Sequence, residues 1–202
     1  MNDANVAGNT YDKYGSTNPI ERRLMSGFFT AFDRMLDGLT PRHILEVGAG
    51  EGHITSLLIE RFPDAEVSGI DLPDDDLAAI WAEAKLPITF GDVTALDYDD
   101  HSIDLIIGME MLEHVTDPQR ALAEIARVAA DTVIVSVPRE PIWRIGNLAR
   151  GHYLGALGNT PGHLNHWSAR GFTRFVASEL TVVDTARPLP WTMVKAISTT
   201  SV

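Results

Sequence analysis

The segment G-M-E-M-L-E-H-V at residues 108–115 brings two carboxylates and an imidazole within about one turn of chain. Two carboxylates and an imidazole suit a hard or borderline divalent cation, and the imidazole can instead serve as a general base. A further histidine occurs in H-L-N-H-W-S at residues 163–168. The predicted ligands of one cation, with Mg²⁺ favoured by cellular abundance, are Glu110, Glu113, His114 and His163. The predicted acid–base residues are Glu113, His114 and His166, of which His166 is also an alternative fourth ligand and His152 a poorer one.

A glycine-rich turn, E-V-G-A-G-E-G at residues 46–52, follows a short apolar run. Glycines at a strand-to-helix turn let the backbone approach a ligand closely. Asp71 follows the next predicted strand, 21 residues after Gly50, where a carboxylate can accept hydrogen bonds from ribose hydroxyls. Asp92, after the third strand, suits an adenine amino group. The sequence contains no G-x-x-x-x-G-K-[ST] loop, which argues against a phosphate-binding NTPase.

Apolar runs predicted as strands alternate with predicted helices, which indicates a mostly parallel sheet with helices on both faces. The predicted strands are 43–47, 65–70, 86–90, 103–108 and 132–137, and the predicted helices are 19–37, 53–61, 75–85 and 119–129. Asn18 is the expected N-cap of the first helix and Ser168 that of the last. Two β-type runs, 180–187 and 191–197, are separated by Pro-Leu-Pro and predict an antiparallel hairpin at one edge of the sheet.

Two segments are expected to lie on the acceptor side of such a site. Residues 1–18 are polar and are predicted to be mobile, and residues 139–167 form a long irregular insertion after the fifth strand. We expect both to become ordered when ligands bind. The candidate substrate contacts within them are Tyr14, Arg144, Tyr153 and Trp167, although packing within a lid explains each aromatic residue equally well.

Length, charge and composition limit the possible functions. The 202 residues suit one domain, and the net charge of −12 without any run of basic residues argues against nucleic acid as a partner. No apolar stretch reaches the roughly 18 residues of a membrane span, and no secretory signal precedes the domain. The absence of cysteine excludes disulfides and thiolate sites, and the cytoplasm is the expected compartment. A small-molecule acceptor is the expected partner, and the oligomeric state, including a homodimer, stays open.

Four motifs, HILEVGAGEGHIT, SGIDL, GDVTAL and DLIIGMEMLEHV, resemble those of class I S-adenosylmethionine-dependent methyltransferases over about residues 40–137. The resemblance implies a Rossmann-like sheet of seven strands whose last strand is antiparallel. It also implies that Glu46, Gly48, Ala49 and Gly50 hold the methionine part of the cofactor. In the same way it assigns the ribose to Asp71 and Leu72, the adenine to Asp92 and Val93, and the neighbourhood of the sulfonium to Glu110.

Finer resemblances concern the acceptor. The E-x-x-E-H segment and the later H-x-x-x-W-[ST] are similar to those of small-RNA 2′-O-methyltransferases, in which they bind a metal that chelates hydroxyls. Some ubiquinone-pathway O-methyltransferases share the first segment, yet L-E-H-V is also common in metal-free relatives. The N-terminal Tyr-Asp-Lys-Tyr and the insertion resemble actinobacterial methylmannoside methyltransferases. These resemblances imply metal-assisted O-methylation of a small polyhydroxylated acceptor such as a mannoside. A metal-free enzyme for an aromatic or isoprenoid acceptor and a non-catalytic binding module are the alternatives.

Overall fold

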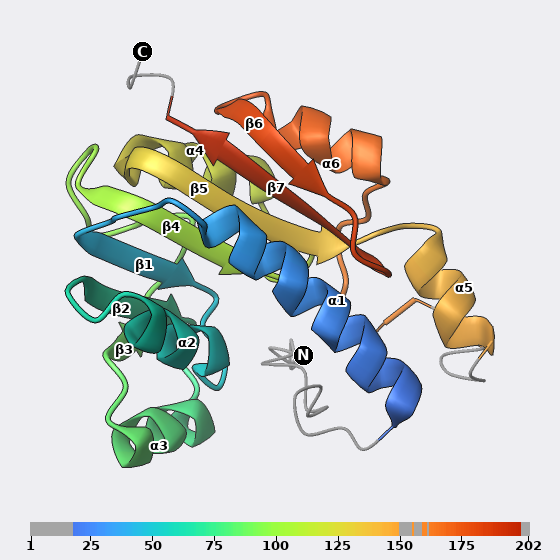
Figure 1. Cartoon of the computed structure of the whole chain (residues 1–202), viewed down its shortest axis with the longest axis horizontal. Helices are drawn as coiled ribbons and strands as arrows, with labels where there is room; N and C mark the ends of the chain where they lie inside the picture. The colour runs from blue at the N-terminus through green and yellow to red at the C-terminus, as the bar shows by residue number, and fades with distance from the viewer. Residues whose placement is uncertain (1–17, 150–154, 156–158, 161, 199–202) are drawn as a thin grey trace, which may run out of the picture.

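The structure is a computed structural model that describes residues 18–149, 155, 159–160 and 162–198. Seven strands form one sheet in the order β3-β2-β1-β4-β5-β7-β6 (Figure 1). Strands β1 to β5 are parallel, and β7 runs antiparallel to both β5 and β6. This order confirms the predicted fold and the edge hairpin. The strands are β1 His43–Val47, β2 Glu66–Asp71, β3 Ile88–Phe90, β4 Ile103–Met109, β5 Ala129–Pro138, β6 Thr181–Ala186 and β7 Trp191–Ile197.

Helices cover both faces of the sheet, because successive strand residues point to opposite sides. Ile44 and Leu105 face one core, in which α1 and α2 pack, while Leu45 and Ile106 face a second core with α4 and α6. Figure 1 shows α1 running across the front of the central strands. The helices are α1 Pro19–Leu36, α2 His53–Arg61, α3 Asp75–Ala84, α4 Pro118–Val128, α5 Ile142–Ala149 and α6 Ala169–Val176.

Both predicted N-caps are present. The side chain of Asn18 accepts a hydrogen bond from the Ile20 amide at 3.0 Å, and Ser168 Oγ accepts one from the Gly171 amide at 3.1 Å. Each cap satisfies an amide that the first turn of the helix leaves without an internal partner. The entry points of α1 and α6 are therefore fixed locally by sequence.

The predictions differ from the structure by more than one residue at three places. The fifth strand begins at Ala129 rather than at residue 132, directly after α4. The third strand begins at Ile88 rather than at residue 86, because Lys85 ends α3 in the left-handed conformation (φ 55°) and Pro87 follows. The insertion 139–167 is not irregular throughout, since α5 occupies Ile142–Ala149 directly after Pro141. A proline at the start of a helix is tolerated because the amide N–H that it lacks would have no partner within the helix. Pro141 could therefore have been used to predict the start of α5.

The parallel strands end at a common edge of the sheet. The strand order reverses between β1 and β4, which is the position where open α/β sheets bind ligands. The glycine-rich turn leaves β1 at this edge, and the segment containing Glu110 leaves β4 beside it. The fold thus brings together the two segments that carry the chemical motifs.

Candidate active site

The glycine-rich loop begins as an extension of the β1–β2 ladder. The amides of Gly48 and Ala49 both donate to the Ile70 carbonyl, at 2.9 and 3.1 Å. Gly48 has φ +74°, and a Cβ there would lie 2.6 Å from Cβ of Met111. Only glycine therefore lets the loop pass so close to the segment that follows β4.

Asp71 ends β2 and holds the same loop from the other side. Its Oδ2 accepts a hydrogen bond from the Gly50 amide at 2.6 Å, and its Oδ1 accepts one from the Leu72 amide at 2.7 Å. The indole of Trp81 in α3 donates to the Gly50 carbonyl at 2.7 Å. The carboxylate that the sequence assigns to ribose is thus positioned beside the glycine loop.

Large apolar side chains remain exposed at the ends of β2 and β3. Leu72 is 54% exposed and Phe90 is 48% exposed, and the Phe90 ring lies 5.7 Å from the ring of Trp81. An apolar surface beside carboxylates suits a flat heteroaromatic ring with polar edges. Phe90 was not singled out from the sequence, although its place one residue before Gly91-Asp92 was visible there. Val93, which the sequence analysis assigns to the adenine, packs into the core instead.

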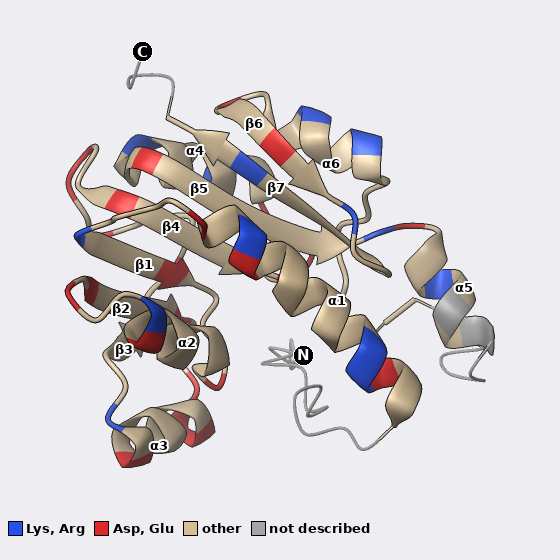
Figure 2. Ribbon diagram, in the orientation of Figure 1, with Lys and Arg blue, Asp and Glu red and all other residues tan. Residues whose placement is uncertain are grey.

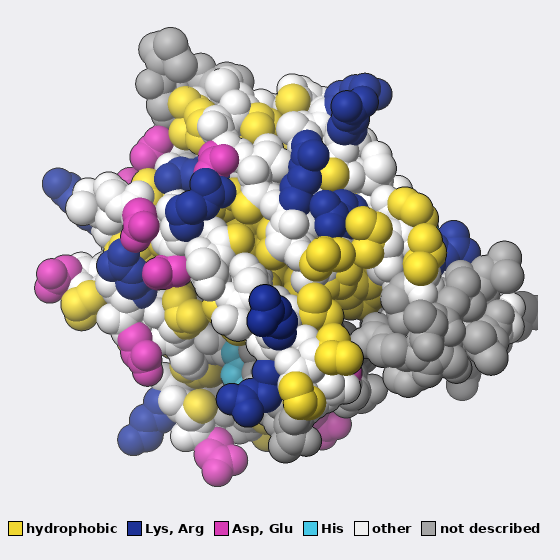
Figure 3. Space-filling view, turned by 45° about the vertical axis from the view of Figure 1, so that its right-hand side comes forward, with side chains coloured by type: hydrophobic (Ala, Val, Ile, Leu, Met, Phe, Trp, Pro, Cys, Tyr) yellow, Lys and Arg dark blue, Asp and Glu magenta, His cyan; other side chains and the backbone are white. Residues whose placement is uncertain are grey.

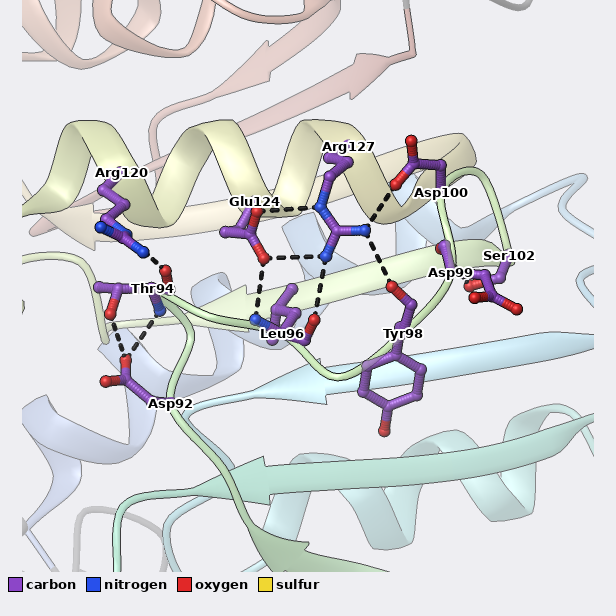
Figure 4. A network of polar contacts seen from close by, with 10 residues as sticks. All are labelled: Asp92, Thr94, Leu96, Tyr98, Asp99, Asp100, Ser102, Arg120, Glu124 and Arg127. Atoms are coloured by element: carbon purple, nitrogen blue, oxygen red, sulfur yellow. Dashed lines mark hydrogen bonds and ion pairs between the residues drawn. The ribbon is translucent and has the colours of Figure 1, made fainter.

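The loop that carries Asp92 is held against α4 by the polar network of Figure 4. Asp92 Oδ1 accepts from both the amide and the hydroxyl of Thr94, at 2.8 and 2.7 Å. Arg127 donates to Glu124, to Asp100 and to the carbonyls of residues 96 and 98. Arg127 also holds the pKa of Glu124 below its usual range. The network links α4 to the strand end where Asp92 is found.

Glu46, near the end of β1, is buried, and its carboxyl accepts a hydrogen bond from the hydroxyl of Thr55. Burial, with a smaller contribution from the nearby negative charge of Asp71, raises the pKa of Glu46 to about 8. The carboxyl is therefore mainly protonated at neutral pH in the ligand-free chain. A cationic group of a ligand placed beside it would favour ionisation.

Glu110 follows β4 in a left-handed conformation with φ 54°. Its amide donates to the Ser136 carbonyl at 3.0 Å, which continues the β4–β5 pairing, and its carboxylate accepts a hydrogen bond from the indole N–H of Trp191. Trp191 starts β7 and is 4% exposed. No pattern in the sequence indicates this contact, because 81 residues separate the two side chains.

Three of the four predicted metal ligands meet in one cluster. Glu113, His114 and His163 each offer a ligand atom, and these atoms lie within 4.8 Å of one another. Glu113 and His163 are buried, and the two imidazole rings are 4.9 Å apart at 87°. Glu110 is not part of this group.

Backbone contacts fasten the two halves of the cluster together. The amides of Leu164 and Asn165 donate to the Glu113 carbonyl at 2.8 and 3.0 Å. Nδ1 of His114 lies 3.0 Å from the Gly162 carbonyl oxygen. Because a carbonyl oxygen only accepts, Nδ1 carries the proton of this hydrogen bond, and Nε2 is the ring nitrogen that could ligate a cation. The loop 162–165 thus positions the histidines before any ligand arrives.

The remaining predicted acceptor residues lie apart from this cluster or outside the described chain. His166 is exposed and hydrogen-bonds Asn159 Oδ1 at 2.6 Å. Trp167 packs against the rings of Phe172 and Phe175, and Arg144 is half-buried on α5. The predicted substrate and ligand residues Tyr14, His152 and Tyr153 lie outside the described residues, as do residues 1–17 of the predicted mobile segment. Figure 3 shows histidine atoms at the bottom of a recess in the surface.

Comparison with known proteins gives the class. Residues 45–135 match the family model of a methyltransferase domain. Together with the seven-stranded sheet and the glycine loop at its switch point, this match supports a class I S-adenosylmethionine-dependent methyltransferase, whose fold the chain has.

Individual relatives are more distant. The chain is 31% identical to ajmaline N-methyltransferase of Rauvolfia serpentina over 104 residues, covering 47% of this chain and 35% of that protein. It is 29% identical to ubiquinone biosynthesis O-methyltransferase of Idiomarina loihiensis over 162 residues, covering 74% of this chain and 65% of that protein. Magnesium protoporphyrin IX methyltransferase of Synechocystis, solved with bound SAH, superposes with TM-score 0.66 at 17% identity over 92% and 90% of the two chains.

These curated relatives differ in the atom that they methylate, as their names state. The chain spans between about a third and two thirds of their length. The fold and the matched domain therefore support the class, while the acceptor has to be argued from the site itself.

Proposed function

We propose that the protein is an S-adenosylmethionine-dependent O-methyltransferase that uses a divalent cation to bind a small polyhydroxylated acceptor. The cluster of Glu113, His114 and His163 is the observation that carries this proposal. The similarity of the chain to a ubiquinone biosynthesis O-methyltransferase, over 74% of its length, supports oxygen as the methylated atom.

The donor set fits a divalent cation. One carboxylate and two imidazoles suit Mn²⁺ or Zn²⁺, and Mg²⁺ where waters or acceptor hydroxyls complete an oxygen-rich shell. The Gly162 carbonyl fixes the His114 tautomer, as an outer partner of a metal ligand commonly does. A cation bound there would lower the pKa of a coordinated hydroxyl and orient it. Vicinal hydroxyls, as in a sugar or a catechol, make the best chelating acceptor.

Methyl transfer demands more of the acceptor than of the donor. S-adenosylmethionine carries its methyl group on a sulfonium that needs no further activation, whereas an alcohol is a weak nucleophile until it loses its proton. In this proposal Asp71, Asp92 and Glu46 hold the cofactor, and Glu110 lies beside the sulfonium. Glu113, His114 and His163 hold the acceptor hydroxyls in line, and His166 is our candidate for the general base.

The alternative is a metal-free enzyme for an aromatic or isoprenoid acceptor. It is favoured by the ubiquinone relative and by the aromatic rings of Trp143 and Trp191, which lie beside His163 and Glu110 respectively. In that case His114 or His163 is the general base, with Glu113 orienting it. The two functions differ in one measurable property, which is metal dependence.

A small acceptor also fits the surface. Figure 2 shows Lys and Arg scattered among acidic residues along the described chain, and the whole sequence has a net charge of −12. We therefore propose no nucleic acid substrate. Within the described residues, no helix has the length and apolar character that crossing a bilayer requires. A cytoplasmic location and a homodimer stay proposals.

The test combines metal binding with turnover. Metal-free protein is titrated with Mn²⁺ and Zn²⁺ by calorimetry, and production of S-adenosylhomocysteine is followed with a methyl mannoside, a catechol and a quinol. We expect binding of one ion per chain and turnover that EDTA abolishes and Mg²⁺ or Mn²⁺ restores. Full turnover of metal-free protein in excess EDTA would contradict the metal and favour the alternative.

Variants locate the effect. Glu113→Gln and His163→Gln are each expected to weaken metal binding at least ten-fold and to leave S-adenosylhomocysteine binding within two-fold, because they contact only the acceptor side. His43→Gln is the matched control, since His43 lies at the opposite end of β1 and is half-exposed. Unchanged metal binding in both cluster variants would exclude the cluster as the site.

A further inference from the structure

Trp191 lies outside residues 45–135, which match the methyltransferase domain, and pairs with Pro138 at the edge of the sheet where the parallel strands end. It is the first residue of β7, and its indole N–H donates to the carboxylate of Glu110. Its ring packs edge-on against Phe28 of α1, with centroids 5.1 Å apart. The ring is therefore held by the core, and its N–H is directed at Glu110.

The aromatic contacts continue toward the acceptor side. The rings of Trp191 and Trp143 lie 6.1 Å apart, and Trp143 stacks on His163 at 6.0 Å with an interplanar angle of 27°. Trp143 is fixed in turn by a 2.9 Å hydrogen bond from its indole to Thr160 Oγ1. A continuous row of rings thus joins Glu110 to the histidine cluster.

We propose that Trp191 is a positioning residue that holds the Glu110 carboxylate toward the sulfonium and so makes the site prefer the charged cofactor over its uncharged product. This inference rests on the proposed placement of Glu110. Glu110 leaves β4 in a left-handed conformation, and its carboxylate accepts a hydrogen bond from the indole N–H of Trp191. A neutral N–H donor orients the carboxylate without cancelling its charge, which a lysine or arginine in the same place would do.

The orientation of the Glu110 carboxylate should affect the binding of charged and uncharged ligands differently. S-adenosylmethionine and S-adenosylhomocysteine share adenosine and the amino-acid moiety, but only the first carries a positive charge at sulfur. A carboxylate held beside that sulfur favours the charged ligand, and the advantage falls when the carboxylate turns away. Loss of general packing would weaken both ligands alike.

The experiment measures dissociation constants of three ligands by calorimetry: S-adenosylmethionine, S-adenosylhomocysteine and sinefungin, which carries an ammonium in place of the sulfonium. Trp191→Phe keeps an aromatic ring and removes the N–H. We expect it to weaken the two charged ligands about three- to ten-fold and S-adenosylhomocysteine less than two-fold. An equal loss for all three ligands, or no change for any of them, overturns the proposal.

Controls separate this inference from its premise. Met193→Leu alters a fully buried residue of the same strand and core and should leave all three constants within two-fold. Glu110→Gln should itself reduce the preference for the charged ligands. An unaltered preference in Glu110→Gln overturns the placement of Glu110 and the proposal with it, whereas a change there without one in Trp191→Phe overturns only the role of Trp191. Should Trp191→Phe fail to fold, Trp191→Leu, which is apolar and has no hydrogen-bond donor, is measured instead. This variant must then weaken the charged ligands selectively, and an equal loss for all three ligands or unchanged constants overturns the proposal.

Discussion

Replacement of Glu46 by Gln is expected to change how the stability of the fold depends on pH. Burial raises the pKa of Glu46 from 4.5 to about 8 in the folded chain, while in the unfolded chain the carboxyl titrates near its ordinary value. Between these values the unfolded state has lost the proton and the folded state keeps it. Stability therefore falls as the pH rises through this window, and it is independent of Glu46 below about pH 4.5 and above about pH 8.

The magnitude follows from the displacement of the pKa. At 1.36 kcal/mol per pH unit, the change from 4.5 to about 8 corresponds to about 5 kcal/mol of unfolding free energy across the window. This is a large share of the 5–15 kcal/mol that is typical of a domain. A neutral Gln keeps the shape of the protonated carboxyl and the contact with Thr55 but cannot titrate.

The assay is urea unfolding followed by tryptophan fluorescence at several pH values between about 5 and 8.5. The wild type should lose about 1.4 kcal/mol per pH unit relative to Glu46→Gln between about pH 5.5 and 7.5. Glu66→Gln removes a carboxylate whose side chain is 82% exposed, and it should show no such difference. A constant difference between wild type and Glu46→Gln over this range would refute a buried, protonated Glu46.

Three further substitutions test other parts of the site. Asp71→Asn removes charge-assisted hydrogen bonds and should weaken cofactor binding about ten- to a hundredfold by calorimetry, and unchanged binding would contradict the ribose assignment. Gly48→Ala should cost about 2–4 kcal/mol in urea unfolding, because φ is +74° and the new Cβ meets Met111. Gly50→Ala, with φ +52° and open space, should cost only about 1–2 kcal/mol, so equal losses would argue against the close approach. Arg127→Met should lower the free energy of unfolding by about 2 kcal/mol at pH 7, since the guanidinium is a third exposed. The loss should become smaller as the pH falls through the lowered pKa of Glu124, and a loss that does not depend on pH would exclude Glu124 as the partner.

The local features of this protein were predictable from neighbouring residues. Alternation of apolar strands and helices predicted the parallel sheet, and Pro-Leu-Pro between two β-type runs predicted the edge hairpin. The caps at Asn18 and Ser168 followed from residue type and position. The order of the motifs along the chain also placed Glu46, Asp71 and Asp92 near the carboxyl ends of successive strands. Such features appear as local patterns of residue type along the chain, so they can be predicted from the sequence alone.

Other features depended on which distant segments the fold brings together. Only the tertiary structure pairs Trp191 with Glu110. Strand β7 must first pair with β5 before Trp191, the first residue of β7, can reach the end of β4. Likewise, the sequence predicted Glu110 and His163 as ligands and His166 as an alternative fourth ligand. The contacts of the loop 162–165 with Glu113 and His114 selected His163 for the cluster and left His166 beside Asn159. Burial decides the charge of Glu46 in the same way, since a carboxyl keeps its proton at neutral pH only where the surrounding elements exclude water.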